Sequence, residues 1–152
     1  MTTAGPGSGH DRTPDRDLGP AAATVPVCRP LQRLPGSCHC GAVRFAIETD
    51  LPELTTCDCT ICRRKNALMV KVPEAAFTLL AGEDSLTAYR FHSHTATHYF
   101  CTTCGIKSFY VPRSHPDGFS VNWRALDGVD MIAPVFIPYD GKNWETARAA
   151  LD

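Results

Sequence analysis

The sequence predicts a mainly β domain of short antiparallel strands that follows a disordered N-terminal tail. Two observations carry this prediction. Short apolar or aromatic runs, several of them alternating with polar residues, are separated by turn-forming residues, and a single stretch has helical spacing. The first 36 residues differ from the rest, since they hold six of the twelve prolines, five of the eleven glycines and no aromatic residue.

The N-terminal segment, residues 1–35, is expected to be a disordered tail rich in proline and glycine. A segment without aromatic side chains cannot bury enough apolar surface to offset the entropy that it would lose on ordering. The folded domain is therefore predicted to cover residues 36–152, beginning near Pro35, and a domain of that length can form one modest core. One cysteine, Cys28, lies alone in the tail.

Seven short runs are predicted to be strands. Residues 42–47 place Val43, Phe45 and Ile47 on one face. The other β-branched or aromatic runs are residues 68–72, 77–80, 86–91, 97–100, 106–111 and 119–123. Short strands separated by turns are typical of a small antiparallel sandwich or barrel-like domain.

One stretch at the C-terminus, residues 143–152, is predicted to be a helix. Asn143 belongs to a residue type that caps helices, and Trp144, Ala147 and Leu151 would share one face of the helix.

The charges of the chain nearly cancel, with 15 basic residues against 16 acidic ones. This balance gives no electrostatic reason to expect nucleic acid or an anionic membrane surface as a partner. No apolar run approaches the roughly 18 residues of a membrane span, and the N-terminus lacks the layout of a secretory signal. The chain is therefore expected to be soluble and cytoplasmic.

Seven of the eight cysteines fall into short groups. The spacings are Cys38-x-Cys40, Cys57-x-Cys59-x2-Cys62 and Cys101-x2-Cys104. Disulfides are rare in intracellular chains, and cysteines this close in sequence are poorly placed for structural bridges. A thioredoxin-like redox pair usually lies in an α/β setting, which this pattern does not predict. Metal binding is therefore the favoured interpretation.

The metal is predicted to be zinc, because soft thiolate ligands in a tetrahedral site select zinc or an iron–sulfur centre. Two cysteine pairs supply four thiolates, which make a closed structural site. Gly105 and Gly41, each directly after a cysteine pair, supply the permissive backbone that such turns often need.

Three cysteines then remain, and three protein ligands leave a fourth position for water or substrate, as in catalytic zinc sites. The alternative is that a histidine closes this site. The candidates are His39, His92, His94, His98 and His115.

Four stretches of the sequence resemble the glutathione-dependent formaldehyde-activating enzyme family, which includes centromere protein V-like proteins. They are "GSCHCGAVRF", "CDCTICRRKNA", "FCTTCGIKSFY" and "PRSHPDGFSVNWRALDG", within about Gly36 to Gly141. The resemblance implies a β-tent fold with two zinc ions per chain. It implies a structural zinc on Cys38, Cys40, Cys101 and Cys104. It implies a catalytic zinc on Cys57, Cys59 and Cys62.

The resemblance also implies an enzyme of the carbon–sulfur lyase type, similar to S-(hydroxymethyl)glutathione synthase. Its substrates would be a low-molecular-weight thiol, glutathione or a similar one, and formaldehyde or another small aldehyde. A zinc-stabilised binding module without catalysis is the alternative, for which the centromere protein V-like relatives are a precedent.

Cationic side chains follow the three-cysteine group directly. Arginine is suited to bidentate binding of carboxylates, of which glutathione carries two. Arg63, Arg64 and Lys65 are therefore predicted to bind substrate, with Arg113 as a further candidate. The alternative for the first three is a solvated charged turn.

Overall fold

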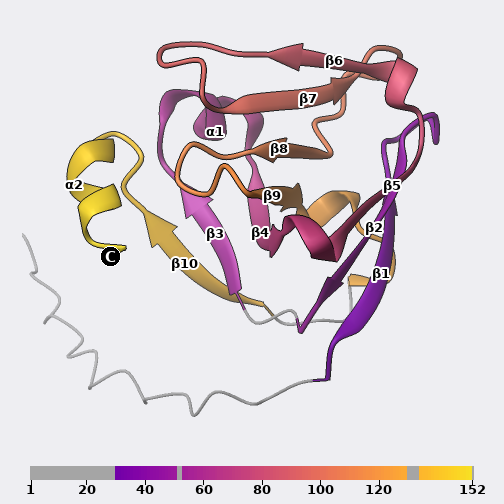
Figure 1. The fold of residues 1–152 in the computed structure, drawn as a ribbon, viewed down its shortest axis with the longest axis horizontal. Helices are drawn as coiled ribbons and strands as arrows, with labels where there is room; N and C mark the ends of the chain where they lie inside the picture. Colours follow the sequence, from indigo (N-terminus) through magenta and orange to yellow (C-terminus); the bar gives the residue numbers. More distant parts are fainter. Residues whose placement is uncertain (1–29, 51–52, 130–133, 152) are drawn as a thin grey trace, which may run out of the picture.

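The structure is a computed structural model that describes residues 30–50, 53–129 and 134–151. Most of the predicted tail, including Cys28, lies outside these residues. The described chain forms two β-sheets with short helical segments between and beside the strands (Figure 1). The prediction of a mainly β fold is confirmed.

The smaller sheet has three antiparallel strands in the order β1-β2-β5, formed by β1 (Gln32–Ser37), β2 (Arg44–Thr49) and β5 (Phe77–Ala81). The first strand begins at Gln32, earlier than the predicted start near Pro35. Proline is tolerated because β1 lies at the edge of its sheet. Gly36 fits because a Cβ there would lie 2.6 Å from the carbonyl oxygen of Ala125.

The larger sheet has seven strands in the order β10-β3-β4-β9-β8-β7-β6. Its members are β3 (Glu53–Cys57), β4 (Leu68–Pro73), β6 (Leu86–Tyr89), β7 (Thr97–Cys101), β8 (Phe109–Val111), β9 (Gly118–Asn122) and β10 (Val135–Tyr139). All neighbouring pairs are antiparallel except β10 and β3, which are parallel. The expectation of antiparallel strands therefore fails for this pair, which is joined by the long connection that parallel pairing requires.

The helices are short: α1 (Thr60–Lys65) follows β3, and α2 (Trp144–Ala149) follows β10. The predicted C-terminal helix is present, and Asn143 occupies its N-cap position. The side chain of Asn143 makes no capping hydrogen bond, however, and donates to Asp140 Oδ2 at 2.8 Å instead. Leu151 lies beyond the end of α2 and is 46% exposed, and no residue of α2 is buried, so the face shared by Trp144, Ala147 and Leu151 is not a buried one. No helix in the described part of the chain could span a membrane.

A cluster of aromatic rings joins the two sheets. Phe45 of β2 and Phe77 of β5 meet Phe109 of β8, with ring centroids 5.6 and 4.7 Å away, and Phe119 of β9 stacks 4.2 Å from Phe77. Such aromatic pairs stabilise a core beyond the effect of burial alone. Both cysteine groups lie at the ends of strands of these packed sheets.

Candidate metal centres and the adjoining cavity

The four-cysteine group connects the two sheets. Cys38 and Cys40 follow β1, Cys101 ends β7, and Cys104 lies in the next turn; all four sulfurs lie within 4.8 Å of one another. Two Sγ–Sγ distances are 3.5 and 3.6 Å. Tetrahedral zinc with Zn–S bonds of about 2.3 Å would place its sulfurs roughly 3.8 Å apart. The donor set therefore fits zinc.

The two turns of this group share one backbone pattern. In each, the first cysteine donates its N–H to the carbonyl oxygen five residues later, at 3.0 Å. Gly41 and Gly105 follow the second cysteine with φ of +75° and +72°, a region that strongly favours glycine. The sequence prediction for these glycines is confirmed, and the turns bring both sulfurs of each pair to one side.

Backbone donors favour the ionised form of two of these thiols, those of Cys101 and Cys104. The N–H groups of Ile106 and Cys40 lower the pKa of the Cys104 thiol to about 6, and the N–H of Cys104 lowers the pKa of Cys101. Because the thiolate is the metal ligand, such donors preorganise the group for a cation.

The three-cysteine group lies where β3 meets α1. Cys57 ends β3, Cys59 is the N-cap residue of α1, and Cys62 is buried in its first turn. Cys59 and Cys62 share a helix face because they are three residues apart. Their sulfurs and that of Cys57 lie within 4.8 Å of one another, and no histidine of the described chain joins them.

These three thiols share charge unequally. Hydrogen bonds from Cys57 and Cys62 lower the pKa of Cys59 to about 2. The pKa of Cys62 is raised because its thiol hydrogen-bonds to Cys57 and Cys59. In the absence of a metal, these hydrogen bonds therefore favour the thiolate form of Cys59.

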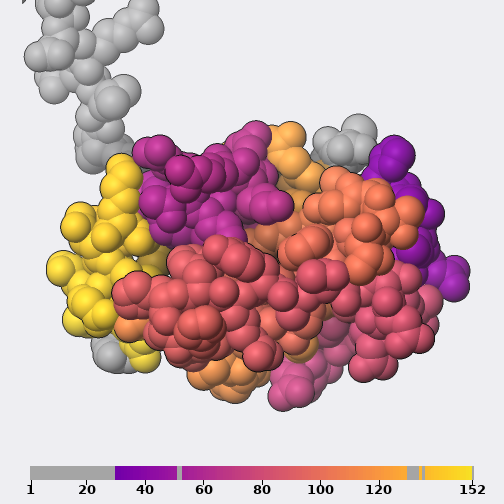
Figure 2. All heavy atoms as spheres, turned by 90° about the horizontal axis from the view of Figure 1, so that it is seen from above, coloured from indigo at the N-terminus to yellow at the C-terminus, as the bar shows by residue number. Residues whose placement is uncertain are grey.

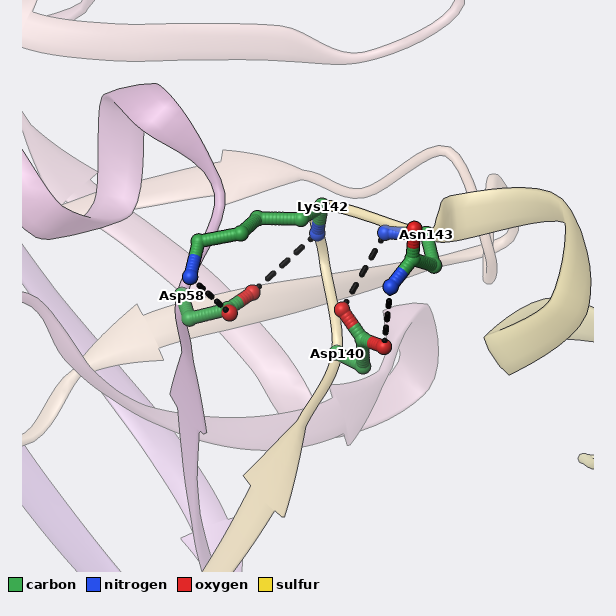
Figure 3. Close-up of polar contacts among 4 residues, drawn as sticks. All are labelled: Asp58, Asp140, Lys142 and Asn143. Atoms are coloured by element: carbon green, nitrogen blue, oxygen red, sulfur yellow. Dashed lines mark hydrogen bonds and ion pairs between the residues drawn. The ribbon is translucent and has the colours of Figure 1, made fainter.

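The C-terminal segment packs directly on the three-cysteine group. A Cβ at Gly141 would collide with Cys57 Sγ and would lie 2.7 Å from Cys59 Cβ. Lys142 holds the segment to Asp58, between two of the cysteines, through its Nζ at 3.0 Å and its backbone N–H at 3.1 Å (Figure 3). Asp140 and Asn143 brace the turn between β10 and α2.

A cavity of about 530 Å³ opens beside the three sulfurs. Its wall combines the three cysteines with side chains of β4, β8, the loop after β8 and the C-terminal segment; they include Lys71, Tyr110, Arg113, Tyr139 and Trp144. Figure 2 shows α1 (purple), the β6–β7 hairpin (red) and the C-terminal segment (yellow) adjoining one another on this side. No member of the four-cysteine group is among the described lining residues. The volume suits a small organic ligand.

Comparison with known proteins agrees with this arrangement. Residues 33–140 match the family described as glutathione-dependent formaldehyde-activating enzyme. The chain belongs to this family. A crystal structure of a Rhodobacter sphaeroides protein is similar, with 35% sequence identity, a TM-score of 0.62, and coverage of 68% of this chain and 99% of that one. The resemblance found in the sequence is confirmed, and the family segment contains both cysteine groups.

The predicted substrate-binding cations do not lie together in the structure. Arg113 lines the cavity, where its guanidinium lies 3.5 Å above the Trp144 ring and 3.0 Å from Glu145 Oε1. Arg64 and Lys65 line a second hollow, of about 380 Å³, between α1 and the β6–β7 hairpin. Arg63 is exposed and lines neither space.

Two further residues at these spaces, Lys71 and Lys107, were not predicted, and a third, His98, was considered only as a possible zinc ligand. Lys71 lines the cavity, and burial lowers its pKa. His98 lines both spaces, and burial lowers its pKa to about 4, so it is neutral near pH 7. Lys107 lines the second hollow and is itself buried. The sequence carried no signal for the lysines, because a single lysine within a strand pattern predicts a solvent-facing position.

Proposed function

We propose that this protein adds a low-molecular-weight thiol, glutathione or a similar one, to formaldehyde or another small aldehyde. The observation that carries the proposal is the convergence of Cys57, Cys59 and Cys62 at the wall of the cavity. The four-cysteine group fits a structural zinc, and the three-cysteine group fits a second zinc with one protein ligand fewer. The family assignment supports glutathione and formaldehyde as the substrates.

The three thiolates would hold zinc with one coordination position facing the cavity. A zinc ion bound there would supply Lewis acidity and would keep a substrate thiol ionised near neutral pH. The reaction joins the thiol sulfur to the aldehyde carbon, and the electron pair of the C=O π bond moves to oxygen. The proton that the thiol loses ends on that oxygen, so the sum is a simple addition.

The protein's own contribution is orientation. An intrinsically electrophilic aldehyde needs little activation, so fixing the thiol against it in a confined space accounts for much of the expected acceleration. The rings of Tyr139 and Trp144 form apolar wall, and Gly141 lets the C-terminal segment close against the sulfurs.

Cationic groups near the cavity would bind the carboxylates of the thiol substrate. Lys71 lines the cavity itself, as does Arg113, although Glu145 already pairs with the latter. Arg63, Arg64 and Lys65 remain predicted substrate contacts, of which the latter two would act from the second hollow. Charge-assisted hydrogen bonds of this kind contribute roughly 1.5–3 kcal/mol each.

Exchange NMR of glutathione and labelled formaldehyde tests the proposal. The zinc-loaded protein should accelerate formation of the adduct above the spontaneous rate, and folded Cys59→Ser should not. Equal rates with the two proteins would contradict catalysis at this group. Glutathione binding without acceleration would instead establish the alternative, a non-catalytic zinc-stabilised binding module.

A further inference from the structure

Lys107 is a buried cation without a hydrogen-bond acceptor. It is 6% exposed, and no described residue accepts a hydrogen bond from its Nζ. A buried, unpaired charge destabilises a fold by several kcal/mol unless another charge compensates it. The position of Lys107 is nevertheless well defined, because Asn122 Nδ2 donates to its carbonyl oxygen at 3.1 Å.

The surroundings of Lys107 identify the compensating charge. Its Nζ lies 4.0 Å above the Tyr110 ring, a contact that favours a cation without neutralising it. Burial lowers the pKa of Lys107 to about 8, and the groups that act against this are the thiols of Cys62, Cys59 and Cys57. The other cation acting on it is Lys65 of α1, which repels it. The Tyr110 ring beneath Lys107 lines the cavity together with the three cysteines. Lys107 also lines the second hollow with Ile61, which lies between Cys59 and Cys62 in the sequence. The three-cysteine group is therefore the anionic group beside Lys107.

Formal charges show what this pairing does. Three thiolates and one divalent zinc carry a net charge of −1, and an anionic fourth ligand would make the net charge −2 in a partly buried site. The positive charge of Lys107 brings these two net charges to 0 and −1. We propose that Lys107 is a positioning residue that makes the three-cysteine centre accept an anionic fourth ligand, a thiolate, in preference to a neutral one. This proposal rests on the function proposed above.

Cobalt-loaded protein allows a direct test, because a new ligand in the first shell changes its absorption spectrum. The probes are 2-mercaptoethanol, which binds as an anion and carries no other charge, and imidazole, which binds neutral. Lys107→Met should weaken 2-mercaptoethanol binding about tenfold or more and should leave imidazole binding within about twofold. Lys107→Arg should restore thiol affinity.

Controls separate this inference from the proposed function. Arg124→Met removes an exposed cation of η3 (Trp123–Ala125) and should change neither affinity. Equal weakening of both probes by Lys107→Met, or no weakening of either, would overturn the inference while leaving the proposed function intact. A wild-type spectrum that no thiol alters would overturn both. Should Lys107→Met fail to fold, Lys107→Gln provides the same comparison with a neutral side chain. Stronger binding of imidazole than of 2-mercaptoethanol by the wild-type protein would also refute the inference.

Discussion

At the scale of single residues, the three-cysteine group depends on how its sulfurs share charge. Cys59 accepts hydrogen bonds from two neighbouring thiols, which lower its pKa to about 2, whereas the pKa of Cys62 is raised. Because a lowered pKa keeps the thiolate at every pH above it, Cys59 should remain ionised throughout the neutral range.

This difference predicts a pH profile for alkylation. In protein with the labile metal removed, iodoacetamide should modify Cys59 at a rate nearly constant between about pH 5 and 8. An ordinary thiol of pKa about 8.5 would react roughly tenfold faster for each unit over that range. Mass spectrometry of the peptides measures each site, and denatured protein is the control. A tenfold rise per unit at Cys59 would contradict the assignment.

Gly141 gives a second prediction at this scale. Gly141→Ala should displace the C-terminal segment or the sulfurs, because the added Cβ collides with Cys57 Sγ. Zinc content should fall from two towards one per chain. Gly128→Ala is the control, since its φ of +73° makes alanine strained there but no atom lies within 4 Å of the added Cβ. Equal zinc loss in both variants would show that general destabilisation explains the effect.

The cysteines were the residues that the sequence predicted best, because short spacings between thiols have few structural uses other than metal binding. The two groups seen in the structure contain the same sulfurs that the family resemblance implied. Lys71 and Lys107 could not be predicted, because their burial depends on strands and loops that meet only in the folded chain.

At the scale of elements, the segment from β10 to α2 forms one wall of the cavity beside the three-cysteine group. It supplies Tyr139, Gly141 and Trp144 to the lining, and residues 141–151 lie beyond the segment that matches the family.

Trp144→Ala tests the role of this wall. Loss of the ring removes apolar surface and the contact with Arg113, so glutathione affinity should fall roughly tenfold, which corresponds to about 1.4 kcal/mol. Calorimetry measures the affinity, and zinc content should remain two per chain. Unchanged affinity would exclude Trp144 from the binding site.

Lys142→Ala is the matched comparison on the same segment. The ion pair with Asp58 is partly exposed, with 58% and 41% of the two side chains accessible. Its removal should reduce the free energy of unfolding by less than about 1 kcal/mol in a urea titration. A larger loss would mean that the segment supports the fold as well as the cavity.

Some elements were not predicted from the sequence, each for a physical reason of its own. The helix α1 has the sequence TICRRK, in which no apolar residues recur at helical spacing. The strand β1 contains Pro35 and Gly36, which normally indicate a turn and are tolerated here by an edge position. The strand β10 pairs with β3 across a separation of about 80 residues. Such a pairing depends on the tertiary structure, and no local sequence pattern predicts it.

At the scale of the whole molecule, the four-cysteine group joins the two sheets. Cys38 follows β1 of the smaller sheet and Cys101 ends β7 of the larger one, so a shared metal would link distant parts of the chain. Zinc binding at such a group is coupled to folding.

Cys101→Ser should therefore yield unfolded or insoluble protein, whereas Cys59→Ser should remain folded with one zinc. Circular dichroism and metal analysis distinguish the two outcomes. A well-folded Cys101→Ser protein that retains two zinc ions would refute the structural role of this group.

The central claim, that one zinc centre is closed and the other open, is tested most directly by X-ray absorption spectroscopy of the zinc-loaded protein. Four sulfurs at one centre and three at the other give an average of 3.5 sulfurs and half a lighter donor per zinc. Addition of glutathione should raise the average to four sulfurs, because a thiolate replaces the lighter donor. An average that glutathione leaves unchanged would contradict the open centre and the enzyme function built on it.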